Sequence, residues 1–262
     1  MHWEDLTSLA FAEAVRTAEG VCIVPIGVVE KHGGHMPLGT DFITAHQLAG
    51  LATQIVPAVI FPAYYFTQNH EAKHLPGAIA ISYRLMYDLL DNVCSEISRN
   101  GLKKIVFLNG HGGNSFFLQH FLRASLEKRL DYTLFCIDLR HYTDAPNWKS
   151  MAESGYILDH AGEWETSLFL ALRPDLVHMD AIAGDGKPQG RLAHLDGLNN
   201  GINWYANQPD HYHGDATLAT AAKGAYLRDH AVQRIAHYLR IVRADTTTAA
   251  LINKFHDQTQ QA

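Results

Sequence analysis

The stretch Glu30-Lys31-His32-Gly33-Gly34-His35-Met36-Pro37-Leu38-Gly39-Thr40-Asp41 follows an apolar run, Val21-Cys22-Ile23-Val24-Pro25-Ile26, that is typical of a buried strand. Its polar side chains therefore begin where a strand ends, which is where open α/β sheets bind ligands. The glycines allow the backbone to bend so that Glu30, His32 and Asp41 converge on one point. Carboxylates and imidazoles without sulfur suit Zn²⁺, Mn²⁺ or a similar divalent ion. We interpret the stretch as a metal site; the alternative is a polar loop whose histidine caps a backbone carbonyl.

Composition indicates a globular protein that acts on small molecules. The chain has 262 residues, 47% of them hydrophobic and 18% charged, with a formal net charge of −6. A chain of this length buries roughly three quarters of its unfolded surface, and no linker interrupts it, so we expect a single domain over residues 1–262. The negative charge offers no broad basic surface, so we expect a small-molecule substrate and no nucleic-acid partner. No apolar stretch approaches about 18 residues, so we expect no membrane partner.

The cysteine pattern indicates the compartment. Cys22, Cys94 and Cys136 each stand singly inside an apolar segment. Such spacing favours buried thiols in a reducing compartment over a disulfide framework or a Cys-x-x-Cys metal site. We therefore expect the protein in the cytoplasm.

Hydrophobic periodicity predicts alternating strands and helices. The expected strands cover residues 21–26, 58–61, 104–108 and 132–138, and the expected helices cover residues 5–18, 41–55, 83–98, 160–170 and 217–242, with one more after residue 114. This order predicts a three-layer α/β/α sandwich with a mainly parallel central sheet. Two connections are long enough for a function: an aromatic one over residues 62–77 that could wall a pocket, and an irregular excursion over residues 180–214 that could cover a pocket or meet another subunit.

A glycine-rich turn, Asn109-Gly110-His111-Gly112-Gly113-Asn114, joins the third strand to the next helix. Such a turn can bind phosphate, but this one lacks the lysine of a P-loop and the Gly-x-Gly-x-x-Gly spacing of a dinucleotide site. Phosphate binding is therefore the second interpretation. The first is that the turn brings His111 to the strand ends, beside the opening stretch.

The expected helix over residues 160–170 carries one imidazole and two carboxylates in its first turn. On a helix, His160 and Glu163 share a face, whereas Glu165 points away from Glu163. The two carboxylates should therefore have different roles. An acidic residue at a helix start, such as Asp41 or Glu163, can also be an ordinary partner of the free N–H groups there.

Three of these segments together resemble the creatininase family of metal-dependent hydrolases. Its members carry a Glu-x-His-Gly-x-His-x-Pro-x-x-Thr-Asp segment, a Gly-His-Gly-Gly-Asn turn and a His-Ala-Gly-x-x-Glu-Thr-Ser helix, and this chain matches all three in order. The segment His213-Gly214-Asp215-Ala216-Thr217-Leu218-Ala219-Thr220 looks like a fourth element, so the likeness covers about residues 23–224. It implies a creatininase-like α/β/α fold and a centre of two divalent ions per subunit. It also implies a homo-oligomer of six subunits.

The resemblance also implies a ligand set. Asp41 would bridge the two ions, with Glu30 and His111 on one ion and His32 on the other. Zn²⁺ is the favoured metal, with Mn²⁺ and Fe²⁺ as alternatives, and two-metal sites hold their ions roughly 3.5–4 Å apart. Four positions of this chain match the family segments directly.

One position departs from the creatinine-hydrolysing members, which have a glutamate where this chain has Gly113. This departure argues against creatinine as the substrate. It also leaves the second ion short of a ligand, and Glu165 is our candidate for that place ahead of Glu163.

The chemistry implied is hydrolysis by a metal-activated water, with His160 passing a proton to the leaving group. The chain has no Gly-x-Ser-x-Gly elbow, which supports this route over a covalent one. We expect hydrolysis of a small cyclic amide or related carbonyl compound. The alternatives on the same centre are ring opening of an inosose-like cyclic polyol ketone and removal of a formyl group; a non-catalytic metal-binding protein is a further alternative.

Overall fold

A parallel four-stranded sheet forms the centre of the protein in a computed structural model that describes residues 1–259. The strand order is β2-β1-β3-β4, with the bounds β1 (Val21–Ile26), β2 (Val59–Ile60), β3 (Lys104–Asn109) and β4 (Thr133–Ile137). Every residue of β1 is buried, as expected for a central strand covered on both faces. All four predicted strands are present, although β2 is shorter than the run over residues 58–61.

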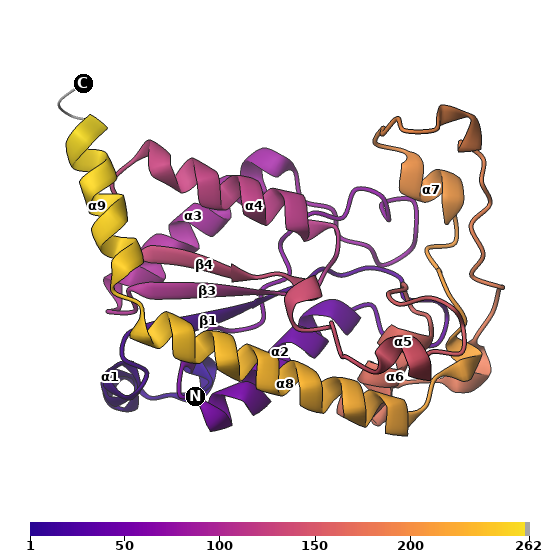
Figure 1. The fold of residues 1–262 in the computed structure, drawn as a ribbon, viewed down its shortest axis with the longest axis horizontal. Helices are drawn as coiled ribbons and strands as arrows, with labels where there is room; N and C mark the ends of the chain where they lie inside the picture. The colour runs from indigo at the N-terminus through magenta and orange to yellow at the C-terminus, as the bar shows by residue number, and fades with distance from the viewer. Residues whose placement is uncertain (260–262) are drawn as a thin grey trace.

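Helices cover both faces of the sheet, and Figure 1 shows α3 and α4 above the strands and α2 and α8 below them. The bounds are α1 (Ser8–Thr17), α2 (Thr40–Ile55), α3 (Tyr83–Arg99), α4 (Asn114–Ala124) and α8 (Ala221–Ala244). Val21 and Ile23 pack with α2 and α8 on one face, whereas Cys22 and Val24 pack with α1, α3 and α4 on the other. Successive strand residues point to opposite faces, so one apolar run serves two cores. The predicted three-layer α/β/α sandwich is confirmed.

The helix predicted from His160 is wrong at its start, because α6 (Glu163–Leu172) begins three residues later. Ala161 has a left-handed φ of 56°, which a helix does not accommodate, and His160 pairs with His213 in an isolated antiparallel bridge. The carboxylate of Asp159 accepts hydrogen bonds from the backbone N–H groups of Trp164 and Glu165, so it caps the helix from outside.

Other helices also differ from the prediction. The segments of α5 (Trp148–Met151) and α9 (Thr247–Thr259) were not predicted to be helical. The helix predicted from residue 217 begins at Ala221, because the side chain of Thr220 accepts a hydrogen bond from Lys223 N–H and caps it there. Within residues 1–259, none of the helices combines the length and the apolar composition needed to cross a bilayer.

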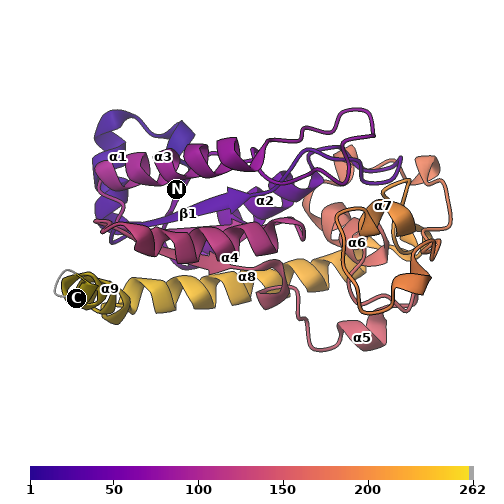
Figure 2. The same cartoon turned by 90° about the horizontal axis from the view of Figure 1, so that it is seen from above.

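The excursion over residues 180–214 is irregular, as predicted, and its main helix is α7 (Asn203–Asn207). Figures 1 and 2 both place α6 and α7 at the same end of the molecule. Single 3-10 turns complete the chain at Trp3–Asp5, Ser125–Glu127, Leu139–His141, Pro174–Leu176, Met179–Ala181, Ala193–Leu195 and Ala216–Leu218.

The three cysteines are free thiols. Burial raises the pKa of Cys22 and Cys94, both of which lie in the core, and it raises the pKa of the half-buried Cys136 to about 12. All three are therefore protonated and weakly reactive near neutral pH.

The ends of β1 and β3 are in register, which places the segments that follow them side by side. Ile26 pairs with Asn109 at the last position of both strands. The start of α2 packs against this edge so closely that a Cβ on Gly110 would lie 2.6 Å from the carbonyl oxygen of Asp41. Glycine at this position thus lets the helix that carries Asp41 reach the strand ends.

Candidate metal centre

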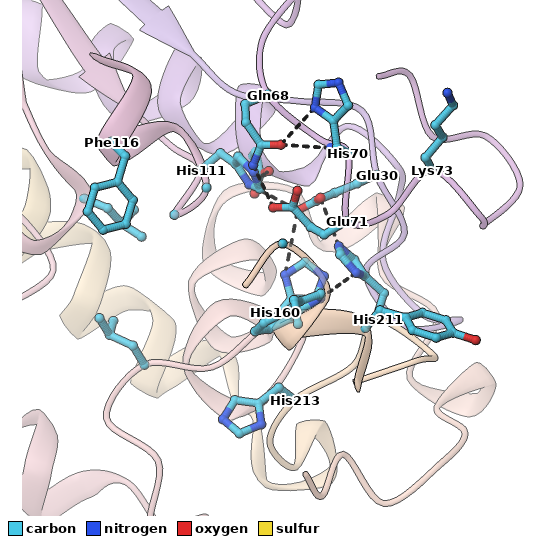
Figure 3. Close-up of a pocket in the computed structure, with 18 of the residues that line it drawn as sticks. Glu30, Gln68, His70, Glu71, Lys73, His111, Phe116, His160, His211 and His213 are labelled. Carbon is cyan, nitrogen blue, oxygen red and sulfur yellow. Dashed lines mark hydrogen bonds and ion pairs between the residues drawn. The ribbon is translucent and has the colours of Figure 1, made fainter. Parts of the chain in front are cut away.

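The carboxyl ends of β1 and β3 bring together all five side chains that the sequence assigns to metal binding. The segment after β1 carries Glu30 and His32, and the first turn of α2 carries Asp41. The turn after β3 carries His111, and the first turn of α6 (Glu163–Leu172) carries Glu165. The first four are buried, and the side chain of Glu165 is 14% exposed. Figure 3 shows Glu30 and His111 side by side in the pocket.

Glu30, Asp41 and His111 form the first group of ligand atoms. The Nδ1 of His111 lies 3.2 Å from Oε1 of Glu30 and 3.1 Å from Oδ2 of Asp41. Both oxygens are buried, and neither has a hydrogen-bond partner among residues 1–259. A buried carboxylate oxygen without a partner is unfavourable, and a cation placed among the three atoms would satisfy all of them. The donor set therefore fits a divalent metal ion.

The second group is built on His32, which faces both Asp41 and Glu165, and a ring nitrogen of His160 also lies within 4.8 Å of the ligand atoms of His32 and Glu165. The Nε2 of His32 lies 3.2 Å from Oδ1 of Asp41 and 3.4 Å from Oε1 of Glu165. The Nδ1 of His32 lies 3.2 Å from the carbonyl oxygen of Glu30, which can only accept, so Nδ1 carries the proton of the neutral ring. This tautomer leaves the lone pair on Nε2, facing the carboxylates, as a metal ligand requires.

Asp41 belongs to both groups, because its two oxygens face different imidazoles. Oδ1 faces His32 and Oδ2 faces His111. Two cations held by the two groups would share this carboxylate. The side chain is placed for that role by the first turn of α2, where free backbone N–H groups also favour negative charge.

The electrostatics of the centre keep Glu165 charged. Burial opposes ionisation of Glu165, but the neighbouring His32 outweighs it and lowers the pKa of Glu165 to about 2. Burial also opposes positive charge on the imidazoles of His32 and His111. Nevertheless, Glu165 and Asp41 hold the pKa of His32 well above its usual range. Glu30 and Asp41 do the same for the pKa of His111. Metal cations compete with protons for such nitrogens and release them on binding.

The two glutamates of α6 have different surroundings, as their helical spacing predicts. Glu165 turns toward His32, and its Oε2 accepts a hydrogen bond from the N–H of Ala161 at 2.6 Å. Glu163 turns away, where it accepts backbone hydrogen bonds from residues 153 and 154 and pairs with Lys223 at 2.6 Å. Of the two, only Glu165 is placed to complete the second group.

Exchanging each glutamate for glutamine is expected to separate the two roles. Glu165→Gln weakens one ligand group, so the protein should retain about one ion per chain when metal content is measured after gel filtration. Glu163→Gln should retain both ions but lose roughly 1–3 kcal/mol of unfolding free energy in urea, since Lys223 loses one of its two carboxylate partners and keeps Glu153. Equal metal loss in both variants would contradict the assignment.

His160, the predicted proton-transfer residue, borders both groups. Its Nε2 lies 2.8 Å from the carbonyl oxygen of Lys31, so Nε2 carries the proton, and its Nδ1 lies 3.8 Å from Oε1 of Glu30. Burial and the charge of His32 lower the pKa of His160 to about 4. The neutral ring thus presents an unprotonated Nδ1 to the centre, and Figure 3 shows it pointing toward Glu30.

Three residues near the centre were missed from the sequence. His211 lies 3.0 Å from Oε2 of Glu30, Trp204 donates a hydrogen bond to His211, and Asp159 caps α6. Burial raises the pKa of Asp159 to about 7. Asp159 could have been found, because an aspartate just before an acidic helix start is a usual N-cap signal. The aromatic and histidine residues of the segment 204–213 indicated only that this segment is more than a linker, and did not single out His211 or Trp204.

A cavity of about 1190 Å³ opens from the centre. The connection over residues 62–77 forms one wall, as expected, and the excursion forms another. The lining of the cavity includes polar, aromatic and aliphatic side chains, among them Gln68, Glu71, Tyr83, Phe116, Ile202 and Trp204. Phe116 is 90% exposed, so the cavity extends from the buried centre to an apolar rim.

The space beside Gly113 is filled by residues from the connection over residues 62–77. A Cβ on Gly113 would lie 2.5 Å from Nε2 of His111, 2.7 Å from Nε2 of Gln68 and 2.9 Å from Oε1 of Glu71. Gln68 donates a hydrogen bond to Glu71 at 2.8 Å, which holds both side chains there. A glutamate at this position, as in the creatinine-hydrolysing pattern, would have to displace these side chains.

Gly113→Ala is therefore expected to disturb the centre, whereas Gly112→Ala is the matched control, since a Cβ there has nothing within 4 Å. The added methyl group must displace His111 and with it the ligand atom Nδ1. We expect a loss of about 1–3 kcal/mol in stability and a lower metal content for Gly113→Ala, measured by thermal denaturation and elemental analysis. Two variants that behave alike would contradict this account.

Comparisons with known proteins give one consistent family match. A family model described as creatinine amidohydrolase matches residues 4–239. The mycofactocin precursor peptide peptidase of Mycobacterium ulcerans is 30% identical, covering 82% of this chain and 84% of its own. The 3-dehydro-scyllo-inosose hydrolase of Thermotoga maritima is 27% identical, and the match covers 85% of this chain and 77% of the hydrolase. The creatinine amidohydrolase of Pseudomonas putida is 25% identical, covering 68% and 74%.

Solved structures show the same fold. A Zn–Zn form of a creatininase mutant superposes with a TM-score of 0.80 at 21% identity, covering 93% of this chain and 98% of its own. A manganese form of creatininase superposes with a TM-score of 0.75 at 23% identity, covering 93% and 99%.

Proposed function

Because the chain belongs to the creatininase family, we propose that it hydrolyses a carbon–nitrogen amide bond of a small molecule at a centre of two divalent metal ions. Family membership makes the chain a hydrolase, since the creatinine, inosose and peptide relatives are all hydrolases. The reading as a non-catalytic metal-binding protein therefore has no support. The bond, the substrate and the number of ions are the proposed part.

The observation that carries the proposal is the position of Asp41, whose two oxygens face two imidazoles 3.1–3.2 Å away. In the proposed centre Glu30 and His111 would hold one ion, His32 and Glu165 would hold the other, and Asp41 would contribute to both. The oxygen and nitrogen donors favour Zn²⁺ and also suit Mn²⁺ or Fe²⁺. The Zn–Zn and manganese forms among the structural neighbours support a divalent metal.

Bound divalent ions would polarise the substrate carbonyl and lower the pKa of a water molecule toward neutrality. The chain's own contribution is proton transfer through His160. Its Nδ1 faces the centre without a proton, so it can accept one from the attacking water and pass it to the leaving nitrogen. Its Nε2–H stays on the carbonyl oxygen of Lys31, which keeps the ring in this orientation throughout.

The cavity supports a substrate larger than creatinine. Typical small-molecule pockets have volumes of roughly 300–1,000 Å³, and this one reaches about 1190 Å³ with an apolar rim. The space beside Gly113 is closed by Gln68 and Glu71. We propose an amide, cyclic or open, whose remaining part reaches from the centre toward Phe116. The peptide peptidase relative supports an amide bond.

A second candidate is ring-opening hydrolysis of a cyclic polyol ketone on the same centre. It is supported by the inosose hydrolase relative, whose match covers 85% of this chain. Both reactions need a polarised carbonyl and a water nucleophile, so the centre itself does not separate them.

We also propose a homo-hexamer. The excursion reaches the centre of its own chain through His211, and the family resemblance is what supports the hexamer. A mass near 29.2 kDa by light scattering at micromolar concentration would contradict the oligomer.

A substrate panel tests the proposed function. Protein loaded with Zn²⁺ or Mn²⁺ is assayed with cyclic amides including creatinine, short peptides, formamides and cyclic polyol ketones. We expect turnover of amides other than creatinine, abolished by a chelator and restored by metal. Turnover of ketones alone would establish the second candidate instead.

A further inference from the structure

We propose that His211 is a positioning residue that holds the metal ligand Glu30 in its binding orientation, and that Trp204 fixes the tautomer of His211. The inference rests on the proposed metal centre. The three side chains form a hydrogen-bonded chain from the excursion to the centre. Trp204 Nε1 lies 2.7 Å from His211 Nδ1, and His211 Nε2 lies 3.0 Å from Glu30 Oε2. Figure 3 shows His211 facing Glu30 from the side opposite His111.

The indole determines where the proton of His211 lies. The Nε1–H of tryptophan can only donate, so Nδ1 of His211 must accept and carries no proton. The proton of the neutral ring is therefore on Nε2, where it is donated to Oε2 of Glu30. His211 lies close enough to Glu30 and His160 to form a third group of ligand atoms, but this tautomer leaves its Nε2 with no lone pair for a metal.

The consequence for Glu30 is that its two oxygens have separate tasks. Oε2 is held by His211, while Oε1 faces Nδ1 of His111 in the first ligand group. Glu30 is fully buried and His211 is 2% exposed, so no bulk water competes for this contact. Partners that orient a metal ligand typically contribute 10–100-fold to metal affinity.

The excursion that carries His211 is fastened at several points. His74 donates a hydrogen bond to the carbonyl oxygen of Pro209 at 2.8 Å, and the backbones of His213 and His160 exchange two hydrogen bonds of 2.9 Å. Trp204 also contacts the ring of His160 edge-on, at 5.7 Å between centroids. The excursion is thus a structural part of the metal centre, and its docking controls how firmly Glu30 holds its ion.

Zinc transfer to a chromophoric chelator measures this effect without any substrate. His211→Leu removes the donor at similar volume, and we expect it to release the first zinc ion about 10–100-fold faster than the unmodified protein. His211→Gln keeps an N–H donor and should restore most of the retention. Trp204→Phe keeps an aromatic ring but frees the tautomer, so release should be faster by up to about tenfold. Tyr205→Phe is the control, because Tyr205 lies on the same helix but is not part of the hydrogen-bonded series Trp204–His211–Glu30. This variant should release zinc at the unmodified rate.

The tautomer supplies a second readout. In ¹⁵N-histidine-labelled zinc protein, the imidazole signals that vanish in His211→Gln should have the pattern of a ring protonated on Nε2. A metal-bound or Nδ1-protonated pattern would overturn the inference. The inference would also be overturned if the unmodified protein binds two ions and the His211→Leu variant releases them at the same rate as the unmodified protein. Failure of the unmodified protein to bind zinc would instead refute the proposed centre itself.

Discussion

Asp41→Asn is expected to abolish both metal binding and hydrolysis. An asparagine has nearly the same shape but only one acceptor oxygen and no negative charge. In the structure the two oxygens of Asp41 face His32 and His111, so the substitution removes a donor from one group and charge from both. Since even a partner that only orients a ligand contributes 10–100-fold to affinity, we expect a loss of more than about 100-fold at both sites.

Elemental analysis and activity of the same preparation measure this result. We expect well under one ion per chain, with activity at the background level. Glu163→Gln is the control, because it makes the same chemical change in a buried carboxylate of α6 that pairs with Lys223. An Asp41→Asn protein that kept two ions would refute the bridging role.

His160→Ala is expected to have a different effect, a lower turnover with both ions in place. Nδ1 of His160 faces the centre but is 3.8 Å from the nearest carboxylate oxygen of Glu30, and its other nitrogen is occupied by the carbonyl oxygen of Lys31. Loss of a proton-transfer group typically lowers the rate by 10²–10⁴-fold. The expected value lies in that range, measured as kcat on metal-loaded protein.

The control for His160 is the metal content of the variant. If His160→Ala loses an ion in parallel with its activity, the residue is a ligand and the division of the centre into ligands and a proton-transfer group is wrong. A variant with full metal content and unchanged kcat would remove His160 from the reaction.

The part of the site that follows strands could be predicted from the sequence. Apolar runs at residues 21–26 and 104–108 are strong strand signals, and polar residues directly after parallel strands must share one sheet edge. The structure confirms that neighbourhood, with Ile26 and Asn109 paired at the ends of β1 and β3. Glu30 and His111 therefore came together as expected.

The parts that depend on tertiary contacts could not be predicted. His160 looked helical because helical spacing continues from α6, and only its bridge to His213 and the left-handed Ala161 exclude it. His211 reaches Glu30 across 181 positions of sequence, from an excursion without periodicity. Local patterns carry no signal for such a contact.

Anomalous diffraction at the zinc edge, from crystals of zinc-loaded protein, tests the two-metal centre most directly. We predict two peaks roughly 3.5–4 Å apart. One should lie among Glu30, Asp41 and His111, and the other among Asp41, His32 and Glu165. A single peak, or a peak coordinated by His160 or His211, would contradict the account.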